Sequence, residues 1–375
     1  MEKIIDRLRF PLMALGLLAL LAGLWAGLVR LGWGWPPLRP TLPMSHGPLM
    51  ISGFLGTVIG LERAVALSAL RYAQGNSADS RRQAGNYGWT YLGPLLTALG
   101  AVFLIIGAPG LPGPLFMTLG SLGLVLVFGL ILRLHLAFFT MTMALGAALW
   151  LVGNSLWLLG WPIPTIVGWW SGFLILTIAG ERLELGRVLR PPRRAQRPFG
   201  GAIGLLLMGL VVTLFDLTLG SRLAGAGMIA LALWLWRYDV ARHTVRKTGL
   251  TRFIAICLLS GYIWLGAGGL LNLLYGGVTA GPYYDAIQHA IFIGFVMAMI
   301  FGHAPIIFPA ILGRPLTFKP LFYSHLSLLH LSLLLRLGGD LAAWLPGRQW
   351  GGLLNAAAIL LFLANTVWAI KTTTN

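Results

Sequence analysis

Two histidines inside long apolar runs are the residues of this sequence best suited to chemistry. His46 lies at the start of the second run, and His289 lies about two turns into the tenth. An ionisable side chain inside a membrane span is costly, so each is a candidate for function. If both runs cross the membrane in the same direction, the imidazoles lie at similar depth on separate helices. The two axial ligands of a six-coordinate heme iron need that arrangement.

A stripe of small residues follows His46 along the same helix. At 3.6 residues per turn, one helical face carries His46, Gly53, Thr57 and Gly60. The stripe offers a smooth surface on which a flat macrocycle can lie, so Gly53 and Gly60 are candidate cofactor-binding residues. The alternative is that these glycines let two helices pack closely, as glycine often does in membranes.

Two arginines are candidate partners for the anionic part of the same ligand. Arg39 and Arg336 lie on the side of the membrane that is expected for His46 and His289. Guanidinium groups form paired hydrogen bonds with carboxylates, and heme carries two propionate carboxylates. We therefore count Arg39 and Arg336 as candidate cofactor-binding residues.

A second group of histidines lies deeper in the expected membrane. His303 follows His289 by nearly four helical turns, which places it on the same face about 21 Å away. His325 and His330, in the eleventh run, fall near the same depth. Three imidazoles can bind copper or a second heme, although His325 and His330 point about 140° apart around their helix. The alternative for His303 is a hydrogen bond to the Tyr323-Ser324 pair.

The remaining ionisable residues favour plainer roles. His135 and His243 end apolar runs among arginines, as is typical of residues at the membrane interface. The groups Glu62-Arg63 and Glu181-Arg182-Glu184 fall near the inner ends of their runs and predict solvated or interfacial ion pairs. A carboxylate at which protons enter the membrane is the alternative for these pairs.

The composition indicates which kind of structure positions these residues. Hydrophobic residues make up 57% of the 375 and charged residues only 10%, with a mean hydropathy of +0.82. A soluble domain carries about 25% charged residues. At roughly 20 apolar residues per span plus a loop, the sequence predicts an all-α integral membrane protein of about twelve transmembrane helices. The net charge of +17 then indicates topology and not nucleic-acid binding, and the single Cys257 excludes a disulfide or a thiolate cluster.

Apolar runs and basic loops predict how the chain crosses the membrane. The expected spans are 10–31, 44–70, 90–107, 114–138, 139–160, 163–189, 199–219, 222–245, 250–275, 283–312, 319–343 and 349–371. Basic residues gather in alternate loops, which marks these loops as cytoplasmic; they are Arg71, Arg81, Arg82, Arg190, Arg193, Arg194, Arg197, Arg237, Arg242, Arg246, Lys247, Arg252, Arg314 and Lys319. We expect cytoplasmic N and C termini in a bacterial-type cytoplasmic (inner) membrane, with the lipid bilayer as partner.

A short motif recurs along the chain. Gly53, Gly172 and Gly294 each precede a phenylalanine and lie 119 and 122 residues apart. This spacing equals about four spans, so it favours three four-helix units, at about 10–138, 139–245 and 250–371. The units would belong to a single polytopic domain, 1–375.

The same histidine-bearing stretches resemble the NnrS family of membrane proteins, which are associated with heme, copper and the response to nitric oxide. The stretch from His46 to Phe54 is similar to that family's early histidine followed by Gly-Phe. A later stretch is similar to its His-Ala, Met, Gly-His and Gly-Arg-Pro pattern, through His289-Ala290, Met299, Gly302-His303 and Gly313-Arg314-Pro315. Here Gly-His precedes Gly-Arg-Pro by about ten residues, whereas the family usually places them together.

A more distant resemblance is to the catalytic subunit of heme-copper oxidases. Those subunits have twelve helices in three four-helix arcs and hold a heme with histidines on the second and tenth helices, where His46 and His289 lie. The sixth and seventh spans, which carry the copper histidines of the oxidases, have no histidine here. The resemblance therefore implies the helical arrangement but not the oxygen-reducing centre.

Two functions follow from these observations. The first is a membrane protein that binds heme b through His46 and His289, with His303, His325 and His330 as a candidate copper site, and acts as an oxidoreductase in nitric oxide or nitrosative-stress chemistry. A quinol or a small redox protein would donate the electrons, and the protein could form oligomers. The alternative is a secondary transporter or channel without a cofactor, because helix repeats and glycine-rich, broken spans are common in such proteins.

Overall fold

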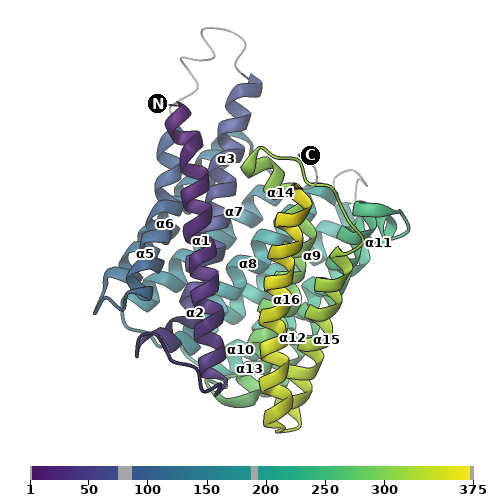
Figure 1. Ribbon diagram of the computed structural model, residues 1–375. Helices are drawn as coiled ribbons and strands as arrows, with labels where there is room; N and C mark the ends of the chain where they lie inside the picture. Colours follow the sequence, from purple (N-terminus) through teal and green to yellow (C-terminus); the bar gives the residue numbers. More distant parts are fainter. Residues whose placement is uncertain (1, 75–86, 187–192, 372–375) are drawn as a thin grey trace. The chain divides into compact units, whose positions relative to one another are not determined.

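The structure is a computed structural model that describes residues 2–74, 87–186 and 193–371. Arg81, Arg82 and Arg190, which belong to the predicted basic loops, lie outside these ranges. Within them every regular element is a helix, and no strand occurs (Figure 1). The prediction of an all-α fold is therefore confirmed, and it agrees with the rule that a spanning segment must satisfy its own backbone hydrogen bonds.

The number of apolar spans differs by one from the expected twelve. Among the described residues, eleven helices are long and apolar enough to cross a membrane. The remaining long helix, α15 (Phe322–Leu341), has a spanning length of 20 residues but is not one of the eleven. It carries two histidines, an arginine and an aspartate, which are His325, His330, Arg336 and Asp340. The chain is a multi-pass membrane protein, and α15 is the helix whose polar residues need partners inside the protein.

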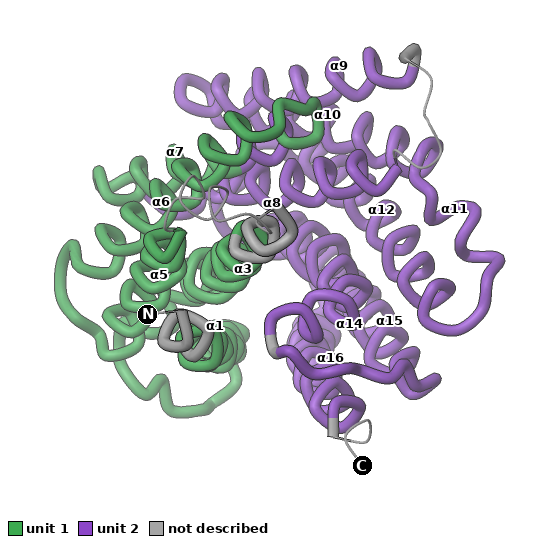
Figure 2. Tube along the Cα trace, turned by 90° about the horizontal axis from the view of Figure 1, so that it is seen from above, with its two compact units in different colours: residues 1–140, 147–161 green, residues 141–146, 162–375 purple. Residues whose placement is uncertain are grey.

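The chain divides into two compact units, which Figure 2 colours green and purple. Unit 1 comprises residues 1–140 and 147–161. Its elements are α1 (Glu2–Arg30), η1 (Leu42–Ser45), α2 (His46–Pro48), η2 (Leu49–Gly56), α3 (Thr57–Gln74), η3 (Tyr87–Tyr91), α5 (Leu92–Ile105), α6 (Pro112–Leu134) and most of α7 (Phe138–Leu158). The threefold repeat of four helices stays a prediction.

Unit 2 comprises residues 141–146 and 162–375. Its elements are α8 (Ile163–Leu185), α9 (Arg193–Val212), α10 (Leu217–Tyr238), α11 (Ala241–Thr244), α12 (Gly249–Tyr275), α13 (Gly281–His289), η5 (Ala290–Met297), α14 (Ala298–Leu312), α15 and α16 (Leu345–Lys371). In α8, 78% of the apolar window is buried inside the protein, the largest share among the eleven spans of the described chain. Polar groups on α8 must therefore find partners inside the protein.

The helix boundaries follow the expected spans closely except at α9 and α10. The sequence places the break between these helices near residues 220–221, but the structure places it at residues 213–216. The Asp216 side chain caps α10 by accepting a hydrogen bond from Leu219 N at 2.9 Å. Gly220 lies inside α10, where a Cβ would overlap the backbone of Thr213. This glycine serves close helix packing and does not form a turn.

Two spans contain a π-helical segment of eight residues, η2 and η5. They are the two π-helical elements in the described part of the chain. The first begins three residues after His46, and the second begins directly after His289. Because π-helical turns are rare and often mark functional sites, their position next to these two histidines directs attention to both.

Candidate functional site

The imidazole of His46 lies against the backbone of α1. Its Nδ1 is 2.7 Å from the carbonyl oxygen of Gly23, and a Cβ on Gly27 would lie 2.7 Å from the ring carbon Cε1. The absence of a side chain at Gly27 therefore makes room for the ring. Since a carbonyl oxygen only accepts hydrogen bonds, Nδ1 carries the hydrogen in the neutral ring, and the acceptor lone pair is on Nε2.

A tryptophan holds the π-helical segment that follows His46. The indole of Trp150 covers Gly56, where a Cβ would overlap the ring. Its Nε1 donates to Ser52 Oγ at 3.0 Å, and Ser52 Oγ donates to Asn154 Oδ1 at 3.2 Å. Asn154 in turn donates to the carbonyl of Met117 at 3.2 Å. This buried network joins η2 to α6 and α7 within unit 1.

His289 has a similar local setting in unit 2. Its Nδ1 lies 2.8 Å from the carbonyl oxygen of Asp285, one helical turn earlier, and 3.4 Å from the carboxylate of the same residue. In η5, Gly294 lies against Trp264, whose ring a Cβ would overlap. As with His46, the neutral ring carries its hydrogen on Nδ1 and its lone pair on Nε2.

Four charged side chains next to His289 form the Asp285 cluster, which we define as Asp285, Arg336, Asp340 and Arg348. Asp285 accepts two hydrogen bonds from Arg336, from Nε at 2.8 Å and from Nη2 at 2.9 Å. Arg348 Nη2 lies 3.7 Å from Asp285, and its Nε lies 3.1 Å from Asp340. The predicted propionate partner Arg336 thus already binds a carboxylate of the chain and is buried. Arg39, in unit 1, is exposed.

His303 belongs to a second group, the Arg182 cluster, which we define as Arg182, Asp239, Tyr262 and His303. Arg182 binds Asp239 through Nε at 2.8 Å and Nη2 at 3.2 Å, and its Nη1 lies 3.5 Å from His303 Nε2. His303 Nδ1 lies 2.6 Å from the Met299 carbonyl. The buried Tyr262 hydroxyl lies beside the ion pair but has no hydrogen bond of good geometry. His303 thus lies beside Arg182, a contact that the sequence does not predict.

His325 and His330 have separate surroundings. His330 accepts a hydrogen bond from Trp264 Nε1 at 3.0 Å and lies 2.9 Å from Ser260 Oγ through its other nitrogen. His325 lies 3.1 Å from Asn365 Nδ2 within a cage of phenylalanines, which are Phe253, Phe301, Phe322 and Phe362. Among the residues that the structure describes, no three of the types His, Cys, Asp and Glu are grouped to hold a metal ion. The arrangement of these histidines does not fit a copper centre.

The glycine stripe after His46 lies in helix contacts of unit 1. A Cβ on Gly53 would lie 3.0 Å from Ala101 Cβ and 3.1 Å from Ala19 Cβ, and one on Gly60 would lie 3.3 Å from Pro94 Cδ. Thr57 donates a hydrogen bond to Thr97 at 3.1 Å. These contacts support the packing alternative for Gly53 and Gly60.

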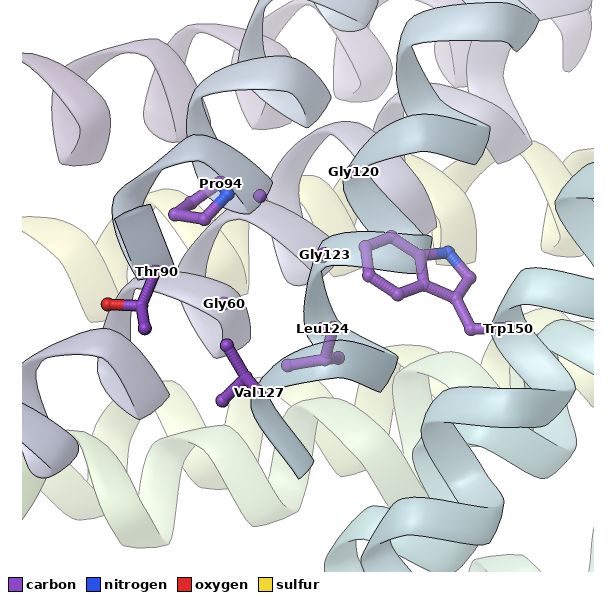
Figure 3. Close-up of a pocket in the computed structure, with 10 residues that line it drawn as sticks. Gly60, Thr90, Pro94, Gly120, Gly123, Leu124, Val127 and Trp150 are labelled. Atoms are coloured by element: carbon purple, nitrogen blue, oxygen red, sulfur yellow. The ribbon is translucent and has the colours of Figure 1, made fainter. Parts of the chain in front are cut away.

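A narrow slot remains beside Gly60 (Figure 3). It has no room for even a water-sized molecule, and glycines of η2, α3, α5 and α6 line it together with Pro94 and Trp150. Ligand pockets usually measure about 300–1,000 Å³. The slot is too small for a macrocycle and reflects the missing side chains of its glycines.

Sequence reasoning missed several polar partners. Arg182 is buried, with 4% of its side chain exposed, and its ion-pair partner is Asp239. Glu62 and Arg63 do approach each other, at 3.7 Å, as expected of an ion pair. Asp285 lies four residues before His289, a spacing that predicts contact on a helix and could have been noticed. Asp239 gave no such signal, because its partner is 57 residues away.

Comparison with protein families gives one match. A family described as a domain of unknown function, DUF8744, matches residues 9–371. This match covers nearly the whole chain, so the chain belongs to that family. A search of curated proteins finds no match.

Proposed function

We propose that this member of the DUF8744 family binds heme b in a bacterial-type cytoplasmic membrane, with His46 and His289 as axial ligands. The observation that supports this proposal best is the similar local environment of the two imidazoles. Each has Nδ1 against a main-chain carbonyl, and each lies shortly before a π-helical segment, His46 three residues before η2 and His289 directly before η5. A ring held in this way presents Nε2 as its acceptor atom, as imidazoles that ligate iron commonly do.

The residues around the two histidines fit an axial ligand. Gly23 and Gly27 hold the ring of His46, and the Asp285 carbonyl and carboxylate hold that of His289. Such outer hydrogen bonds fix the tautomer and the orientation of a ligand. Heme held by two imidazoles supplies one-electron transfer. The resemblance to the NnrS family extends the proposal to nitric oxide or nitrosative-stress chemistry, with a quinol or a small redox protein as donor and both termini cytoplasmic.

An absorption spectrum of the purified full-length protein tests this proposal. After expression with excess heme, we expect a Soret band and, after dithionite, a sharp α band. His46→Ala and His289→Ala should each abolish or shift these bands, whereas His135→Ala, at an exposed helix end, should leave them unchanged. Added imidazole should restore the bands of His46→Gly if the variant has lost only its ligand. A folded protein from heme-replete cells without a Soret band would contradict the proposal.

Gly27→Ala tests the contact between α1 and the ring of His46. The new Cβ would come within 2.7 Å of the ring, so the imidazole must turn away from α1. We expect a shifted α band or a several-fold weaker retention of heme in detergent. Gly129→Ala in α6 is the matched control, because a Cβ there meets nothing within 4 Å. Equal spectra for the two variants would show that Gly27 does not position the ligand.

The second candidate function is a cofactor-free transporter. The observation that favours it is the pair of clusters around Asp285 and Arg182, because ionisable groups inside membrane spans often line ion or proton paths. A single preparation of the purified protein can distinguish heme binding from transport. Absence of the Soret band, together with ion flux into proteoliposomes that Arg182→Gln abolishes, would favour the transporter.

A further inference from the structure

The segment between α10 and α12 is strongly basic and exposed. We call residues 237–252 the basic segment; it contains the short helix α11. Five of its side chains are permanent cations, and all five are exposed: Arg237, Arg242, Arg246, Lys247 and Arg252. Within the described chain none of the five has an acidic ion-pair partner. Their charge is therefore available to a partner outside the protein.

The only acidic residue of the basic segment is turned into the protein. Asp239 has 1% of its side chain exposed and is held by Arg182 of α8. The same carboxylate accepts a hydrogen bond from Ala241 N at 2.6 Å, at the start of α11. Two consequences follow. Arg182 neutralises the one carboxylate that would offset the five cations. The hydrogen bond from Ala241 N to Asp239 also holds α11 against the core of unit 2.

Apolar side chains accompany the cations at this end of α10. Leu233 is 65% exposed and Trp236 is 47% exposed, both within the last two turns of the helix. Tryptophan favours the level of the lipid headgroups. Figures 1 and 2 both show α11 at the periphery of unit 2. Exposed cations thus adjoin a surface that is suited to acyl chains.

We propose that the basic segment binds the headgroup of an anionic phospholipid. A phospholipid carries a phosphate for the cations and acyl chains for Leu233 and Trp236, whereas an acidic soluble protein would match only the charges. Basic groups next to membrane spans attract anionic lipids through the same electrostatics. This site is independent of heme, and His46 and His289 take no part in it.

Native mass spectrometry of the full-length protein in detergent tests the site directly. The probes are phosphatidylglycerol, phosphatidylcholine and inorganic phosphate at equal concentration. We expect preferential binding of phosphatidylglycerol, which inorganic phosphate does not displace. The variant R242Q/R246Q/K247Q should bind phosphatidylglycerol on the order of 100-fold more weakly, because each cation near a lipid surface contributes about fivefold. Phosphatidylcholine binding should not change.

The matched control removes the same charge elsewhere. Arg30, Arg133 and Arg222 are exposed and lie at other helix ends, so R30Q/R133Q/R222Q should retain wild-type binding of phosphatidylglycerol. Equal losses in both triple variants would show an effect of net charge alone and overturn the site. Unchanged lipid binding in R242Q/R246Q/K247Q, with loss of an acidic protein that co-purifies with the wild type, would also overturn it and identify a protein-docking surface.

Discussion

Replacing Arg182 with leucine is expected to destabilise the protein by about 3–5 kcal/mol, because Asp239 then remains charged inside the protein without a partner. The side chains of Arg182 and Asp239 are 4% and 1% exposed, so water cannot replace the lost contact. Two hydrogen bonds, at 2.8 and 3.2 Å, join them. The free energy of unfolding in detergent micelles, from reversible denaturation, measures the effect.

A double variant separates the unpaired charge from the loss of packing. Asp239→Asn removes the charge but keeps an oxygen that can accept the hydrogen bond from Ala241 N. The combination of Arg182→Leu with Asp239→Asn should therefore be more stable than Arg182→Leu alone, by about 2 kcal/mol or more. Arg197→Leu, at an exposed position of α9, should change stability by about 0.5 kcal/mol at most. If the single and double variants unfold alike, Asp239 is not left as a buried charge.

Two glycines of α9 should respond to alanine in opposite directions. A Cβ on Gly209 would overlap the backbone of Ala224 in α10. Backbone atoms cannot rotate away as side chains do, so the two helices must separate. We expect Gly209→Ala to cost about 1–3 kcal/mol, the usual range for overpacking.

Gly204→Ala is the control on the same helix. Nothing lies within 4 Å of a Cβ at Gly204, and alanine favours the helix over glycine by about 1 kcal/mol. This variant should therefore be as stable as the wild type or more stable. The unfolding midpoints of the two variants test this prediction. A similar loss of stability in both variants would mean that α9 and α10 do not pack as closely as described.

Most of the fold follows from composition, because a bilayer requires long apolar helices and permits little else. The boundary between α9 and α10 differs from the prediction because Gly220 and Ser221 resemble a turn, whereas the actual break, Thr213 to Asp216, contains neither glycine nor proline. The π-helical segments could not be predicted, since an all-apolar run has the same appearance at either helical period.

Only part of the candidate site could be predicted from the sequence. Their position at similar depth inside apolar runs predicts His46 and His289 as candidate ligands, but their Nδ1 contacts depend on Gly23 and on the local helix geometry. The environments of His325 and His330 depend on residues of distant helices, Asn365 and Trp264, that no local pattern links to them. The sequence gives only the depth of a residue in the membrane, and by depth alone His303, His325 and His330 lie together. Their positions within the membrane plane depend on how the helices pack, which the sequence does not show.

The π-helical segments η2 and η5 also bear on how chains of this family have changed in length. A π turn contains one residue more than the α turn that it replaces, so each segment is equivalent to an insertion of one residue. Relatives that are one residue shorter within 49–56 or 290–297 should have an uninterrupted α-helix there. The helix on one side of the deletion, with its histidine, would then be rotated by about 100° relative to the other side. Single-residue gaps at these two places would thus separate chains that keep the histidine orientation described here from chains that have lost it.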